Sequence, residues 1–455
     1  MTVVQKLKSR FWKNEDGGTA ITVSMVLPIL LGFGVLAVDV GHFYAEKSRL
    51  QQAADLAGLS VLAKMRDDGF AHVNYVSDAN ADYRAPLREF AQNNLPTGVG
   101  AKAIGQYDVW FGKWNFEKNW LVPFQNRAPA NAVWINASLS EARGNPVRTF
   151  FGKIYQDFVD VRVQTMAVMP VPHSYHILSP DAEPAMELTN SADLDTFTLQ
   201  VNSDANNALS LVRSFNYGGW RADVTGGAPG TSESRFVTGV DPVGDFLANL
   251  PEPPVPGCSQ IAYVTTGATP ELEPGVYCDG LTITGAESVV LKPGTYVIKG
   301  GPLVIDATMA GKTILGEDVL IYLADEQAEL QLSAGILGLR AKKTGDWAGV
   351  AIMAARGNNA PKLHRITDVN VHLAGIFYTP SSRVEITDGG FNTVCRYLCF
   401  VSDTLRISGT LVNSGSSVST RPSPLGNTSD VPAEPPALRH NMRPYLADKE
   451  RFGFY

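Results

Sequence analysis

Acidic residues in the second half of the chain are the first candidates for chemistry, because paired carboxyl groups hydrolyse glycosidic bonds. A hydrolase needs two carboxyl groups at a set separation, and a calcium-assisted lyase needs clustered acids beside an Arg or Lys base. For Asp388, which precedes Gly389 and Gly390, we favour a turn role, since turns select Asp and Gly. The other candidates also stand singly, mostly in expected turns: Asp279, Glu287, Asp306, Asp318, Asp325 and Glu385. The sequence therefore predicts no catalytic residues, and a protein that binds or cleaves polysaccharide is the alternative.

The seven histidines lack the spacing of a metal site. His173 and His176 are three residues apart near an expected domain junction, and His364 and His372 lie in or near expected strands. Neither a helical metal motif nor a Gly-x-Ser-x-Gly nucleophile elbow occurs. We therefore expect no metal, no cofactor and no small-molecule substrate.

Four cysteines, Cys258, Cys278, Cys395 and Cys399, could form disulfides in an oxidising compartment. Three pairings are open, and sequence alone does not choose among them. We favour Cys258 with Cys278 and Cys395 with Cys399, because each pair is local and brackets an expected turn or coil. A zinc site is less favoured, since three residues separate Cys395 from Cys399 and the other two cysteines lie far apart.

The element that positions everything else is an uncharged run from Ala20 to Val38, which contains Pro28 and Gly32. A helix of this length spans about 28 Å, close to the thickness of the hydrocarbon core of a bilayer. Lys6, Lys8, Arg10 and Lys13 precede it, so the positive-inside rule makes residues 1–18 a cytoplasmic leader. We expect a single-pass protein of the bacterial inner membrane, with the bulk of the chain in the periplasm. A cleaved secretory signal is the alternative, although its apolar core is usually shorter.

The helical pattern continues beyond the membrane. Apolar residues recur at three- and four-residue spacings from Leu50 to Leu62, with charged residues between them. The membrane helix is therefore expected to run on to about Lys64 within a segment covering residues 19–66. Its face from Leu50 to Leu62 is where we expect to find partners.

Residues 14–63 resemble the N-terminal segment of the TadE/TadG-like family of tight-adherence (Flp) pilus assembly proteins, in its TadG-like branch. The matching features are Gly17 and Gly18, Pro28, the exit Ala37-Val38-Asp39, Tyr44, and the run from Leu50 to Asp55. The resemblance implies a role in pilus assembly, with the Tad machinery or pilin-like proteins as partners. Pilin relatives often carry Glu at the fifth position after the cleaved Gly, whereas Val23 stands there in this chain. We therefore expect an uncut anchor.

Residues 67–171 are expected to form a small α/β domain with an antiparallel sheet. A helix is predicted near Tyr83 to Asn93. Large apolar residues alternate with small or polar ones from Tyr107 to Trp114, from Ala132 to Ala137 and from Val161 to Val168, as in half-buried strands.

The second half carries an internal repeat. Leu272 and Leu291 each open a Leu-x-Pro-Gly-x-Tyr motif, with a period of nineteen residues. Short strands and Gly turns at this period predict a right-handed parallel β-helix, or solenoid, over residues 172–217 and 257–416. Residues 218–256 are expected to be an insertion ending in a Pro-rich connector, and residues 417–455 a flexible tail. The solenoid also resembles, more loosely, the C-terminal part of long TadG-like proteins.

The formal net charge of −7 over 455 residues, with no long basic run beyond the leader, gives no electrostatic signal for nucleic-acid binding. The fold class expected is mainly β behind an extended membrane helix. The function expected is that of a non-enzymatic scaffold or anchor in Tad/Flp pilus assembly. A membrane-tethered polysaccharide-binding protein and a surface adhesin are the alternatives.

Overall fold

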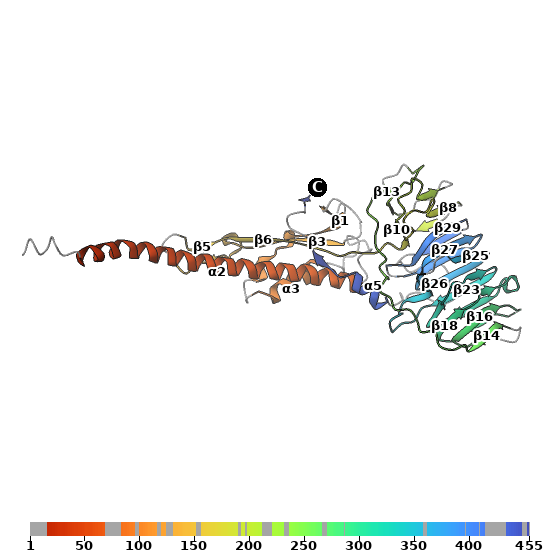
Figure 1. Ribbon diagram of the computed structural model, residues 1–455. Helices are drawn as coiled ribbons and strands as arrows, with labels where there is room; N and C mark the ends of the chain where they lie inside the picture. Colours follow the sequence, from red (N-terminus) through yellow and green to blue (C-terminus); the bar gives the residue numbers. More distant parts are fainter. Residues whose placement is uncertain are drawn as a thin grey trace, which may run out of the picture.

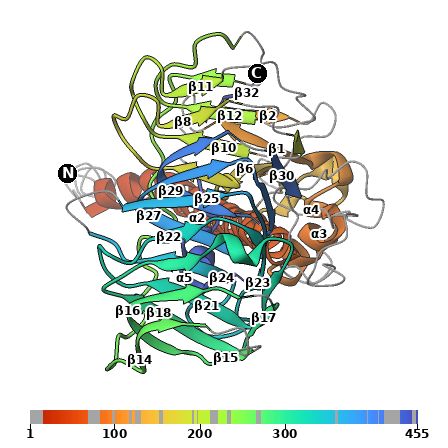
Figure 2. The same cartoon turned by 90° about the vertical axis from the view of Figure 1, so that its right-hand side faces the viewer.

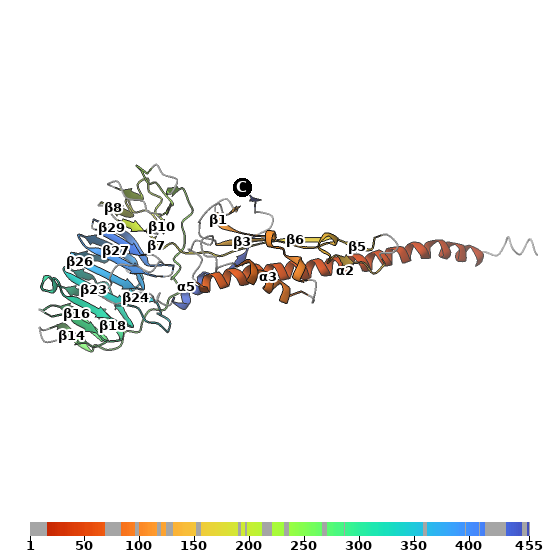
Figure 3. The same cartoon turned by 180° about the vertical axis from the view of Figure 1, so that it is seen from behind.

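The computed structural model describes residues 16–68, 83–95, 100–115, 120–123, 131–151, 156–189, 193–195, 198–211, 221–231, 236–265, 271–285, 287–357, 362–395, 397–408, 410–414, 434–447 and 453–454. Its longest element is helix α2 (Asp16–Asp68). The second half of this helix runs alongside an antiparallel sheet, and its C-terminal end meets a body of parallel strands (Figure 1). The view from behind shows the same succession of uncovered helix, antiparallel sheet and parallel body along the length of the molecule (Figure 3).

The antiparallel sheet lies along the second half of α2. Its four main strands are arranged β6-β3-β1-β2, and β3 pairs with β6 over its whole length. Val133, Ile135 and Ala167 face the helix and are fully buried. The elements of this part are α3 (Arg84–Asn93), α4 (Gly100–Ala103), η1 (Gln106–Asp108), β1 (Val109–Asn115), β2 (Trp120–Pro123), β3 (Ala132–Leu139), η2 (Glu141–Arg143), β4 (Val147–Arg148), β5 (Phe158–Val159) and β6 (Val161–Val168).

The second body consists of parallel strands in three ladders, which the chain visits in turn (Figure 2). The first ladder holds β7 (Tyr175–Ile177), β10 (Thr198–Val201), β12 (Arg221–Val224), β13 (Phe236–Thr238), β18 (Gly294–Lys299), β21 (Val319–Leu323) and β24 (Val350–Ala354). The second holds β8 (Met186–Leu188), β11 (Leu209–Leu211), β19 (Leu303–Ile305), β22 (Leu330–Leu332) and β25 (Lys362–Thr367). Four longer strands belong to both: β14 (Gln260–Val264), β16 (Gly275–Ile283), β27 (Ile376–Thr387) and β29 (Phe400–Ile407).

The third ladder is a separate eight-stranded parallel sheet. Leu272 of one strand pairs with Leu291 of the next, so the nineteen-residue repeat corresponds to one step of this ladder. The strands are β9 (Asp193–Asp195), β15 (Glu271–Leu272), β17 (Val289–Leu291), β20 (Thr313–Gly316), β23 (Gly335–Arg340), β26 (Val369–Ala374), β28 (Gly390–Val394) and β30 (Thr410–Ser414). A 3-10 turn, η4 (Ala307–Met309), precedes β20.

The core of this body is a continuous apolar cluster between the ladders. The rings of Tyr175, Phe400 and Phe377 stack in sequence, with centroids 5.2 Å and 4.9 Å apart. This stack joins the first strand of the body to its last long strands, because Tyr175 of β7 pairs with Phe400 of β29.

The chain order in the body differs from a simple progression. Strands β10, β12 and β13 follow outward from β7, and the chain then passes to the opposite end and begins again at β14. From β14 the strands return step by step until β29 meets β7. The expected insertion at residues 218–256 is therefore wrong in part, since β12 and β13 lie within it and extend the first ladder by parallel pairing.

The tail also contributes to the fold within residues 434–447 and 453–454. Helix α5 (Pro436–Asn441) buries Leu438, and β31 (Tyr445–Leu446) pairs with β6 at the edge of the antiparallel sheet. Strand β32 (Gly453–Phe454) pairs with β2. The expectation of a flexible tail does not hold for these residues, because they satisfy the open edges of the sheet. The rest of 417–455 lies outside the described residues.

Candidate functional site: the apolar helix and its docking surface

The apolar part of α2, residues 21–38, contains no buried residue. It is long and apolar enough to cross a membrane, and none of this apolar stretch is buried by the protein. Met25 and Phe33 are 68% and 66% exposed. The predicted span residues Ala20, Pro28, Gly32 and Val38 all lie in this helix. A Cβ added at Gly32 would meet no described atom within 4 Å, so this side of the helix is open.

The second half of α2 is docked on β3 and β6 through small residues. Ala53, Ala54 and Ala57 are buried there. A Cβ added at Gly58 would lie 3.0 Å from the Cβ of Ala167, so the helix backbone approaches the sheet closely. Leu50 and Leu62 are fully buried in the same cluster. The face from Leu50 to Leu62 therefore contacts the protein's own sheet, and our expectation that this face meets partners is wrong.

Polar residues of the same segment fix the register of the helix on the sheet. The Gln51 side-chain amide donates to Thr165 Oγ1 at 2.7 Å and to Asp55 Oδ1 at 2.6 Å. The Thr165 hydroxyl in turn donates to Asp55 Oδ1. Thr165 is 1% exposed, so these bonds satisfy polar groups that would otherwise be costly to bury.

Asp39 closes the apolar span by binding a second part of the chain. Its carboxylate accepts hydrogen bonds from the backbone N–H of Phe150 at 2.6 Å and of Phe151 at 3.2 Å. The residue is only 4% exposed. Sequence reasoning marked Asp39 as the charge that ends the span but missed this bond, which joins residues more than 110 positions apart. Both donors are backbone N–H groups, so no sequence signal in the side chains of residues 150 and 151 could have indicated this bond.

The last turn of α2 meets the parallel body. The Tyr397 hydroxyl donates to the Arg66 carbonyl oxygen at 2.5 Å, and Met65 is buried in the same apolar cluster as Tyr322 and Tyr378. Helix, sheet and parallel body thus share one continuous cluster.

A strap from Asp245 to Glu252 covers the outer side of the first ladder, a feature that the sequence did not reveal. Arg356 Nη2 donates to the carbonyl oxygens of Leu247 and Leu250 at 3.0 Å and 2.5 Å. The Tyr378 hydroxyl donates to Asp245 Oδ2 at 2.6 Å, and burial raises the pKa of Asp245. Pro251 and its neighbours indicated a stiff connector, but no residue pattern indicated which strands it would cross.

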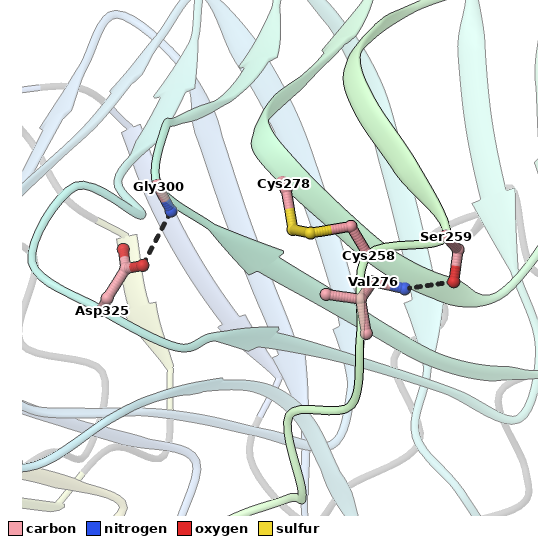
Figure 4. Close-up of a disulfide and its surroundings, with 6 residues drawn as sticks. All are labelled: Cys258, Ser259, Val276, Cys278, Gly300 and Asp325. Carbon is pink, nitrogen blue, oxygen red and sulfur yellow. Dashed lines mark hydrogen bonds between the residues drawn. A yellow bond between two sulfur atoms is a disulfide. The ribbon is translucent and has the colours of Figure 1, made fainter.

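The cysteines pair as favoured from the sequence, Cys258 with Cys278 and Cys395 with Cys399, with Cα–Cα distances of 5.7 Å and 5.4 Å. The first disulfide ties the segment entering β14 to β16, beside a hydrogen bond from the Val276 N–H to Ser259 Oγ (Figure 4). It therefore fastens the terminal strand of the ladder to its neighbour.

Most of the candidate acids occupy turns and caps, whereas Glu385 lies within β27. Asp279, Asp318 and Asp388 adopt left-handed backbone angles, with φ of 58°, 57° and 52°. Asp306 caps η4 by accepting from the Thr308 N–H, and Asp325 accepts from the Gly300 N–H at 2.7 Å (Figure 4). Glu385 pairs with Arg383, and Glu287 enters no described site. Among the described residues, no group of three or more His, Cys, Asp and Glu side chains could hold a metal ion.

Two histidines are buried in the parallel body rather than gathered in a site. Burial lowers the pKa of His176 to about 4 and that of His364 to about 3. His364 Nδ1 accepts a hydrogen bond from the Leu330 N–H at 3.1 Å, so the ring connects the neighbouring strands β25 and β22. His173 contacts Asp223 at 3.0 Å, and His372 lies on β26.

Comparison with known families agrees with this geometry. Residues 17–64 match the Tad family, described as "Putative Flp pilus-assembly TadE/G-like". The match confirms the resemblance over the segment that forms α2. No curated protein and no solved structure shows significant similarity to the chain. The matched segment is therefore similar to a TadE/G-like pilus-assembly domain, and the helix that it forms is long and apolar enough to span a membrane.

Proposed function

We propose that this chain is a single-pass component of the bacterial inner membrane that acts as a scaffold or anchor in Tad/Flp pilus assembly. The observation that carries the proposal is the contrast within α2. Its first half is apolar and uncovered, whereas its second half is locked to the rest of the protein. A helix built in this way would hold the folded part of the chain at a fixed position relative to the membrane.

In this proposal the N-terminus is cytoplasmic and the bulk of the chain is periplasmic. The basic leader supports that orientation, and the two cysteine pairs support an oxidising compartment. The parallel body is proposed to be a right-handed β-helix whose coils place successive strands in the three ladders. Its role is to present a long surface to other proteins rather than to catalyse a reaction.

Partners in the membrane would contact the open face of α2, not the face docked on the sheet. Gly32 and Gly34 lie on the exposed part, and small residues let a neighbouring helix approach closely. Pilin-like helices are the partners that the family match suggests.

In-cell crosslinking tests the proposal. A photo-crosslinking residue at Leu31 or Phe33, which are exposed, should capture Tad or pilin-like components. The matched control at Leu62, which is buried against the sheet, should capture none. Recovery of no pilus or secretion component from any exposed position of α2 would contradict the assembly role.

The second candidate is a membrane-tethered protein that binds or cleaves polysaccharide. The feature in its favour is the stack of parallel strands, because the acids described above lie in its turns and on β27. Hydrolysis of polysaccharide by the purified full chain, abolished by Asp325→Asn or Glu385→Gln, would favour this candidate.

A further inference from the structure

Phe150 and Phe151 form an aromatic tip beside the point where the apolar span of α2 ends. Strands β4 and β5 lead to and from this tip, in the part of the antiparallel domain nearest the uncovered half of α2 (Figure 1). Asp39 holds the tip in place through the backbone N–H groups of both residues. The tip is thereby fixed at the level of Asp39 along the axis of α2.

Both rings are exposed even though a buried carboxylate organises their backbone. Phe150 is 67% exposed and Phe151 is 39% exposed. The Phe150 ring lies 4.8 Å from the ring of His42 on α2. Val38 and Tyr44 are exposed on the same stretch of helix, at 52% and 63%. The apolar surface of the span therefore continues onto a second element.

The depth matches the interfacial layer of a bilayer. From Asp39 to Tyr44 the helix rises about 7.5 Å at roughly 1.5 Å per residue, close to the thickness of the headgroup region on one side. Aromatic side chains favour this layer, where their rings lie between headgroups and acyl chains. Water would be a poor environment for two adjacent Phe rings.

We propose that Phe150 and Phe151 insert into the lipid interface beside α2 and give the protein a second membrane contact. Asp39 is the positioning residue for this contact. A lone helix can tilt and rotate in the membrane, whereas two contacts set the orientation of the sheet and the parallel body. The inference rests on the proposed function in one respect, since it requires α2 to span the membrane.

Spin-label depth measurements on the full chain test the inference. The protein is reconstituted in vesicles of phosphatidylethanolamine and phosphatidylglycerol, with single labels at Phe150→Cys, Leu31→Cys or Tyr107→Cys. Tyr107 is 86% exposed on the antiparallel domain and serves as the aqueous reference. We expect oxygen to reach the label at residue 150 better than a polar nickel complex does, as at residue 31, and the reverse at residue 107.

An aqueous signal at residue 150 together with a lipid signal at residue 31 overturns the inference and leaves the anchor intact. An aqueous signal at residue 31 overturns the anchor, and the inference with it. Adding Asp39→Ala should move the label at residue 150 toward water while the chain stays in the membrane. The control Asp67→Ala, at the other end of α2, should leave the label in place. An unchanged depth in Asp39→Ala would remove the positioning role of Asp39.

Discussion

The Tyr397 hydroxyl donates a hydrogen bond to the Arg66 carbonyl oxygen, which joins the parallel body to the last turn of α2. A carbonyl at a helix end has no partner within the helix, so an outside donor satisfies it. The bond is therefore a direct link between α2 and the parallel body.

Tyr397→Phe should weaken this link by about 1 kcal/mol, the usual net value of one hydrogen bond. We expect faster hydrogen exchange in the last two turns of α2, because the contact that holds the helix end is lost. Tyr277→Phe is the control, since the Tyr277 hydroxyl donates to the Glu273 carbonyl oxygen within the parallel body. Equal exchange at the end of α2 in both variants would contradict the role of Tyr397.

Gly58→Leu should separate α2 from the sheet. The added side chain meets Ala167 and Ile135 at once, and such overpacking typically costs about 1–3 kcal/mol. The control is Gly41→Leu, because a Cβ at residue 41 meets no described atom within 4 Å. Thermal unfolding of the detergent-solubilised full chain provides the measurement. A variant at residue 58 as stable as the one at residue 41 would show that the close approach is not required.

Arg356→Lys should loosen the strap over residues 245–252. Lysine retains the charge but lacks the planar guanidinium, in which Nε donates to the Tyr378 hydroxyl while Nη2 donates to the Leu247 and Leu250 carbonyl oxygens. A single ammonium nitrogen does not reach both sides, so at least one of these partners loses its donor. We expect a loss of about 1–3 kcal/mol and new protease cleavage within the strap. Arg383→Lys is the matched control, since Arg383 is half-exposed in a surface pair with Glu385 and should change stability by less than about 0.5 kcal/mol. If the strap in Arg356→Lys resists the protease as well as it does in the unsubstituted chain, the role of Arg356 in holding the strap is contradicted.

Stability should fall in acid because His176 and His364 are buried in neutral form. Their folded pKa values, about 4 and about 3, lie below the ordinary value of 6.5. The unfolded chain therefore binds more protons as pH falls below about 6.5, and stability decreases until the folded values are reached. Between pH 6.5 and 5 each histidine should remove about 2 kcal/mol.

His364→Gln should reduce this acid sensitivity, since glutamine keeps an acceptor for the Leu330 N–H but does not titrate. The readout is the difference in unfolding midpoint between pH 7.5 and pH 5, which cancels any constant packing cost of the substitution. If the variant shows the same difference as the unsubstituted chain, His364 does not contribute to the pH dependence.

The sequence predicted elements whose signal is local. The uncharged run and the spacing from Leu50 to Leu62 predicted the long helix, and the structure extends it from Asp16 to Asp68. Alternation predicted the strands now seen as β1, β3 and β6. The repeat predicted that Leu272 and Leu291 would occupy equivalent positions, and they pair in register.

What the sequence could not supply are contacts between distant segments. Nothing near Tyr175 indicates that its strand pairs with Phe400, so the return of the chain to its starting strand was missed. The segment from Arg221 to Val224 looked like part of an insertion, because its neighbours in the sequence are rich in Gly. Its pairing with β10 is a contact that its own sequence does not indicate. Asp39 likewise gave no sign of Phe150, since a hydrogen bond to a backbone N–H leaves no pattern in the partner's side chain.

The account depends on α2 remaining in the membrane and carrying the folded body with it. Alkaline extraction of membranes containing the full chain, followed by determination of its N-terminal residue, tests this most directly. We predict that the protein stays in the membrane pellet and that its N-terminus lies before Ala20. Recovery in the soluble fraction, or a mature chain that begins beyond residue 40, would contradict the account.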